Sequence, residues 1–114
     1  MKHLSTKRAK ALQIPKSVKK TVYERDKGLC VVCGRSGLPE AHYIPRSAGG
    51  LGIEQNIVCL CRHHHDLFDF GDGETMAAIA EVIREHLKEC YPDWNEDDLY
   101  YKKYGGAFDE TYNK

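Results

Sequence analysis

Residues 30–33 read CVVC and residues 61–64 read CRHH, and these two stretches decide the fold. Two cysteines three residues apart in a tight turn point both thiolates at one ion. If a helix begins near residue 62, the cysteine before it and the histidine in its first turn reach the same point. Three cysteines and one histidine are a standard tetrahedral zinc set, and such zinc contributes about 10 kcal/mol or more to the folding of small zinc peptides. The sequence therefore predicts a structural zinc site of Cys30, Cys33, Cys61 and His64.

The other cysteines fit this interpretation. The chain has five cysteines, and an odd number without a secretory signal argues against a disulfide framework. Cys59 alternates with Cys61 along an apolar run, and Cys90 lies on the apolar stripe of a helix, so both are expected in the core. His63 is the rival fourth ligand, and a redox role for the first cysteine pair is the alternative to metal binding.

A net charge of zero hides an uneven distribution along the 114 residues. Residues 1–29 carry nine Lys or Arg and two acids, a net charge of +7, whereas residues 66–114 carry five and thirteen, a net charge of −8. A basic N-terminal part is suited to contact phosphates. We therefore expect nucleic acid on the N-terminal and central face, bound in part by Lys16, Lys19, Lys20 and Arg46.

Hydrophobic spacing and turn residues predict an α+β fold. Helices are expected at residues 17–27, 62–70 and 75–90, and a last short helix at 95–104. Two short strands are expected at 38–44 and 57–61, joined by a glycine-rich loop. Residues 1–16 are expected to be a basic flexible arm, residues 17–104 one domain with C-terminal helices over 75–104, and residues 105–114 a loose tail.

The sequence contains no apolar run near the ~20 residues that a membrane span needs, and its basic start lacks the apolar stretch of a signal peptide. A cytoplasmic protein with no membrane partner is the expectation. The oligomeric state does not follow from the sequence.

The residues inside the zinc loop resemble a known family. AHYIPRSAGG at 41–50, followed by IEQNIVCLCRHHH at 53–65, is similar to the core pattern of HNH endonucleases over about residues 22–70. That pattern has a histidine, a proline three residues later, a Gly-Gly loop, an asparagine, and then cysteine and histidine. The chain from about Tyr91 resembles the tails of small phage-type HNH proteins, which implies a phage or prophage origin.

The resemblance implies a ββα-metal (His-Me finger) core and phosphodiester hydrolysis. By position, His42 matches the general base, Asn56 matches the residue that braces the loop and orients this histidine, and His65 matches a helix-borne ligand of a catalytic divalent ion. A neutral imidazole is a suitable base near pH 7, and a divalent ion stabilises the charge that builds on the phosphate. Mg²⁺ is the first expectation for that ion, with Mn²⁺, Ni²⁺ or Zn²⁺ as alternatives.

One position departs from the family pattern. Many members have Asp or His immediately before the general base as a metal ligand, and this chain has Ala41 there. Asp69 is the favoured replacement, since it follows His65 by four residues on one helix face. Glu40 is the alternative, because it lies two residues before His42 on one face of an extended strand. In a third possibility, His42 itself binds the metal.

The sequence therefore predicts a metal-dependent DNA endonuclease that acts on double-stranded DNA with little sequence preference. Two alternatives stay open: a non-catalytic zinc module that binds DNA or another protein, and an RNase of the same fold.

Overall fold

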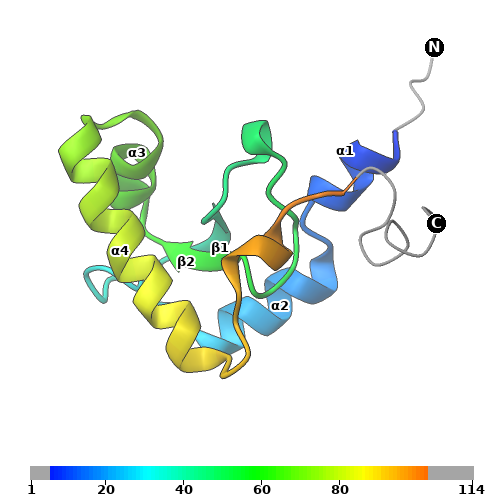
Figure 1. Cartoon of the computed structure of the whole chain (residues 1–114). Helices are drawn as coiled ribbons and strands as arrows, with labels where there is room; N and C mark the ends of the chain where they lie inside the picture. The colour runs from blue at the N-terminus through cyan, green and yellow to red at the C-terminus, as the bar shows by residue number, and fades with distance from the viewer. Residues whose placement is uncertain (1–5, 103–114) are drawn as a thin grey trace, which may run out of the picture.

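The computed structural model describes residues 6–102, which form a small α+β structure (Figure 1). A two-stranded antiparallel sheet lies between helices that come from both ends of the chain. In chain order the elements are α1 (Lys7–Leu12), α2 (Lys16–Arg25), β1 (Leu38–His42), the 3-10 helix η1 (Arg46–Ala48), β2 (Ile57–Leu60), α3 (Arg62–Phe70), α4 (Gly73–Cys90) and the 3-10 helix η2 (Glu96–Leu99).

The sheet is covered on both faces, which makes three layers. In β2, Ile57 and Cys59 pack with Val22 of α2 on one face, whereas Val58 and Leu60 join the larger core on the other face. All four residues of β2 are consequently buried. A strand buried on both faces reads as a continuous apolar run, as the IVCL sequence does.

Helix α4 supplies three buried residues of the larger core. Its predicted apolar stripe is confirmed, with Ile79, Ile83 and Leu87 buried against the sheet. The helix begins two residues earlier than expected, at Gly73, because the Asp72 carboxylate accepts the backbone N–H of Thr75 at 2.7 Å and caps it. Gly73 is thus the first residue of this helix.

The N-terminal region differs from the flexible arm expected over residues 1–16. Residues 7–12 form α1, which begins where the Thr6 hydroxyl accepts the backbone N–H of Ala9 at 2.9 Å. Leu12 at its end is 3% exposed. A side-chain cap and one buried leucine thus make this short helix part of the folded structure.

The C-terminal helix expected over 95–104 is shorter in the structure. Asn95 caps its start, but the helix is only the four-residue η2. The chain then extends and forms an isolated bridge between Tyr100 and Gly50. The expected tail, residues 105–114, lies outside the described residues.

A buried carboxylate joins α2 to β2 and α4. Asp26 accepts hydrogen bonds from the Arg25 guanidinium at 2.7 and 2.9 Å, from His86 Nε2 at 2.7 Å and from the backbone N–H of Cys59 at 3.0 Å. Burial alone would raise the pKa of Asp26, but these hydrogen bonds outweigh it and lower the pKa to about 2. The ionised carboxylate therefore stabilises the layered packing.

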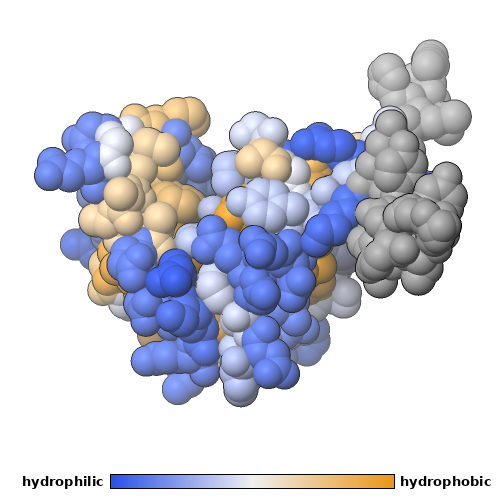
Figure 2. Space-filling view, in the orientation of Figure 1, coloured by the Kyte–Doolittle hydropathy of each residue, from blue (hydrophilic) through white to orange (hydrophobic). Residues whose placement is uncertain are grey.

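Among residues 6–102, no helix combines the length and the apolar character that crossing a membrane requires. In the view of Figure 2, apolar residues gather over α3 and α4, while the lower part of the same face is hydrophilic.

Candidate functional site

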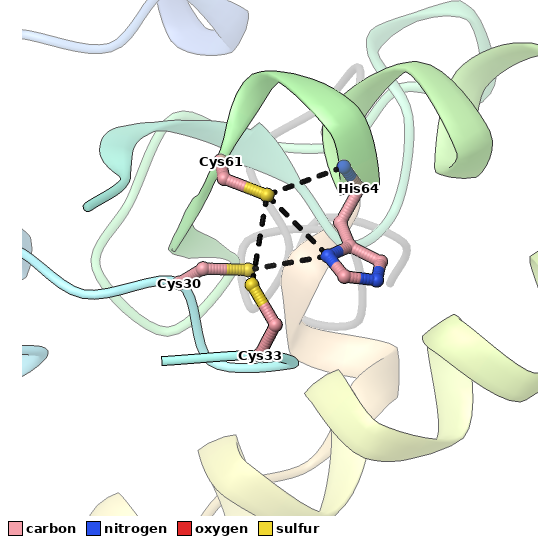
Figure 3. A group of neighbouring side chains, drawn as sticks. All are labelled: Cys30, Cys33, Cys61 and His64. Atoms are coloured by element: carbon pink, nitrogen blue, oxygen red, sulfur yellow. Dashed lines mark hydrogen bonds between the residues drawn. The ribbon is translucent and has the colours of Figure 1, made fainter. Parts of the chain in front are cut away.

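The four predicted zinc ligands lie together and point toward one another (Figure 3). Cys30 and Cys33 come from the turn before β1, Cys61 directly follows β2, and His64 lies in the first turn of α3. All four ligand atoms lie within 4.8 Å of one another. Within the part of the chain that the structure describes, this is the one group of three or more such side chains that meets this criterion.

Three distances in the cluster match those around a tetrahedral zinc ion. Zn–S bonds of about 2.3 Å and Zn–N bonds of about 2.0 Å place two sulfurs about 3.8 Å apart and a sulfur and a nitrogen about 3.5 Å apart. The Cys33 and Cys61 sulfurs are 3.7 Å apart, and His64 Nδ1 lies 3.4 Å from the Cys61 sulfur and 3.8 Å from that of Cys30. This cluster can therefore hold a zinc ion.

Backbone groups around the cluster favour thiolates. Burial raises the pKa of Cys30, but the backbone N–H groups of Cys61, Cys33 and Val32 outweigh it, and the pKa is lowered overall. The sulfur of Cys61 accepts the backbone N–H of His64 at 3.4 Å. The backbone N–H of Arg35 would lower the pKa of Cys33, but burial and the neighbouring sulfurs of Cys30 and Cys61 outweigh it, and this pKa is raised instead. Metal binding needs deprotonated cysteines, and of Cys30 and Cys33 the former is the one that its surroundings favour as a thiolate.

The remaining cysteines and His63 lie outside the cluster. Cys59 is fully buried beside Val22, and burial raises the pKa of its thiol to about 12. Cys90 is half-buried, with its sulfur 3.7 Å from His86 Nε2. His63 is exposed, and its ring meets the His64 ring edge-on.

His42 lies at the end of β1 beside an open groove of 410 Å³, which is lined by Gln13, Ile14, Lys19, Glu40, His42 and Arg46. Its Nε2 lies 2.9 Å from the backbone carbonyl oxygen of Leu12. A carbonyl only accepts hydrogen bonds, so Nε2 carries the proton in the neutral ring and Nδ1 keeps its lone pair. The arrangement thus leaves one ring nitrogen able to accept a proton.

The surroundings of His42 keep it neutral. Burial, followed by the positive charges of Arg46 and His65, lowers its pKa, while the Leu12 carbonyl and the Asp69 charge act in the opposite direction. His42 is therefore unprotonated at neutral pH, the state that a general base requires.

Asn56 is fully buried and holds the loop that follows His42. Its Oδ1 accepts the backbone N–H of Ile44 at 2.8 Å, and its Nδ2 donates to the carbonyls of Ile44 at 3.1 Å and Leu51 at 2.8 Å. The backbone carbonyl of Asn56 accepts the backbone N–H of Tyr43 at 2.8 Å. The side chain thus connects both ends of the loop over residues 44–51.

His65 and Asp69 lie one turn apart on α3, with His65 Nε2 3.5 Å from Asp69 Oδ2. Two ligand atoms bound to one ion at about 2.1 Å lie about 3.0–3.4 Å apart for octahedral to tetrahedral angles. The pair is therefore close to the spacing that a shared ion needs. Glu40, the alternative ligand, instead lies 3.9 Å from the Lys19 ammonium in the groove.

The four predicted phosphate-binding residues are only partly together. Lys19 and Arg46 line the groove beside His42. Lys16 begins α2, and Lys20, on the same helix, pairs with the Glu24 carboxylate at 2.7 Å. Two of the four thus share the surface that holds the histidine.

Sequence reasoning missed the N-terminal residues of this site. Leu12 supplies the carbonyl that binds His42, and the next two residues line the groove. The apolar residues Leu12 and Ile14 within a basic stretch were the only signal that this segment packs against the fold.

Comparisons of the chain with protein-family models, with curated proteins and with solved structures give no match.

Proposed function

We propose that this chain is a metal-dependent DNA endonuclease of the ββα-metal type, with His42 as the general base and a structural zinc at the Cys₃His cluster. The observation that carries the proposal is the state of His42. It is a neutral histidine with an unprotonated Nδ1, beside a groove that also holds Lys19 and Arg46. A base beside Arg46 and Lys19, the second of which lies 3.9 Å from Glu40, suits an anionic substrate such as a phosphodiester.

The order of the elements supports the same conclusion. β1 ends with His42, β2 begins directly after Asn56, and α3 carries His65. The Cys₃His cluster connects the turn before β1 to the start of α3, so a bound zinc would hold the two ends of this ββα unit together.

In the proposed reaction, the Nδ1 of His42 takes a proton from a water molecule whose oxygen attacks the phosphorus. A new P–O bond forms, the P–O bond to the leaving sugar oxygen breaks, and that oxygen takes a proton from solvent. Arg46 and Lys19, which line the groove, would bind the phosphate oxygens. A divalent ion held by His65 and Asp69, with Mg²⁺ as the first expectation, would stabilise the negative charge of the transition state.

Plasmid cleavage with a series of divalent ions tests the proposal. We expect His42→Ala to lower kcat by about 10²–10⁴-fold, the usual contribution of general acid–base catalysis. Asp69→Ala should need a higher metal concentration for half-maximal activity. Asp66→Ala is its matched control, because Asp66 lies on the same helix but pairs with Arg62 at 3.2 Å.

The same assay discriminates the alternatives. A Glu40→Ala variant with the metal dependence expected of Asp69→Ala would make Glu40 the ligand instead. Cleavage of RNA but not DNA would favour the RNase alternative. Full plasmid cleavage by His42→Ala, or none by the wild type with any ion, would contradict the proposed function.

A further inference from the structure

The short N-terminal helix α1 ends directly on the catalytic histidine of the proposed function. The last carbonyls of any helix lack partners within the helix. Here the carbonyl of Ala11 accepts the backbone N–H of Gly52 at 2.9 Å, and the carbonyl of Leu12 accepts Nε2–H of His42 at 2.9 Å. Two carbonyls at the helix end thus accept hydrogen bonds, one from the glycine-rich loop and one from the histidine.

Gly52 makes this close approach possible. A Cβ atom at residue 52 would lie 1.8 Å from the carbonyl oxygen of Gln13 and 2.5 Å from its carbon. Backbone atoms cannot move away as a flexible side chain can, so any side chain here would push the segment after α1 off the loop. The buried Leu12 side chain is the second anchor of this segment.

We propose that α1 is a positioning element for catalysis: the end of the helix, held at Gly52 through the carbonyls of Ala11 and Gln13, presents the Leu12 carbonyl that holds the His42 ring with Nδ1 directed to the groove. This inference rests on the proposed nuclease function. Leu12 acts through His42 and touches no reacting atom, so it is a positioning residue. Without it the ring is free to rotate, and small misplacement of a catalytic group is costly in rate.

The charge of α1 gives this contact a second consequence. Lys7, Arg8 and Lys10 are exposed on the helix whose end holds His42. Phosphates bound along this basic surface would favour the docked position of α1. Substrate binding and the orientation of the base would then support each other.

The test is Gly52→Ala in the full zinc-loaded chain, with Gly73→Ala as the matched control. An added Cβ at Gly73 meets nothing within 4 Å. Two quantities are measured: the kinetics of DNA cleavage, and the ring N–H proton of His42 by NMR of ¹⁵N-labelled protein. In the wild type at neutral pH we expect a proton on Nε2 that exchanges slowly because the Leu12 carbonyl binds it.

In Gly52→Ala this protected proton should disappear and kcat should fall at least about tenfold, and KM should rise because DNA bound along α1 would no longer be coupled to the docked helix. Gly73→Ala should match the wild type in both. If Gly52→Ala loses zinc, Leu12→Ala, which loosens the second anchor, is judged by the same two readouts.

Three outcomes would overturn the inference: a wild type without a protonated Nε2, a Gly52→Ala variant that keeps the protected proton, or one that loses it and still cuts at the wild-type kcat. If the wild type cuts no nucleic acid, the proposed function fails on its own. The ring-proton measurement then still decides whether α1 holds His42.

Discussion

Replacing Asn56 with alanine should destabilise the protein by about 3 kcal/mol, because Asn56 satisfies three backbone groups of the loop after His42. The N–H and C=O of Ile44 are buried, and each buried group left without a partner costs about 1–3 kcal/mol. The Leu51 carbonyl is only partly buried, so solvent can replace much of its bond. The two Ile44 groups at about 1 kcal/mol each, a smaller cost for the Leu51 carbonyl and the lost packing of the Asn56 side chain add up to about 3 kcal/mol.

Urea unfolding at a fixed excess of zinc measures this difference, with fluorescence of the single Trp94 as the probe. Asn95→Ala is the matched control. Asn95 is exposed, and its side chain makes one bond, to the backbone N–H of Asp97 at 2.9 Å, so its loss should cost about 1 kcal/mol or less. A loss below about 1 kcal/mol for Asn56→Ala, or equal losses for both variants, would refute the reasoning.

Three further predictions follow from the zinc cluster, from His42 and from the buried carboxylate. Cys61→Ser should lose the single zinc of the wild type when titrated with a chelator, whereas Cys90→Ser, outside the cluster, should retain it; equal retention would disprove the assigned ligands. The rate of DNA cleavage should rise with pH along a limb with its midpoint below pH 6.5, because burial lowers the pKa of His42 and the base acts when unprotonated; a midpoint above 6.5 would contradict this. Asp26 has its pKa lowered to about 2, so its contribution of about 2 kcal/mol is present above its unfolded pKa of 3.8 and is lost as pH falls toward 2. The difference in unfolding free energy between wild type and Asp26→Asn should therefore shrink over that pH range, and a constant difference would argue against it.

Local patterns predicted most of the elements. The helix at 62–70 has the predicted bounds, and the strands and the long helix are found within a few residues of theirs. The ends of helices were harder to predict, because a capping residue such as Asp72 shifts the first residue of a helix by a turn or less. The prediction of a flexible arm over residues 1–16 fails at residues 7–12, which form α1. A helix of six residues is too short to show a hydrophobic period in the sequence.

The sequence by itself determined the Cys₃His cluster that can hold a zinc ion. Cys30 and Cys33 lie in one turn, Cys61 and His64 lie in another, and spacing within each pair already aims two ligands at one point. The sequence also indicated His42, Asn56 and His65 as residues of one site, through resemblance to a family pattern. These inferences depend on short separations along the chain or on the order of a few residue types.

Only the tertiary structure decided how His42 is held. Its partner is a backbone carbonyl thirty residues earlier, and a carbonyl belongs to every residue type, so no sequence pattern marks it. The contact also depends on the missing side chain of Gly52, which lets the segment after α1 lie against the loop. Which ring nitrogen carries the proton is therefore a consequence of packing between distant segments.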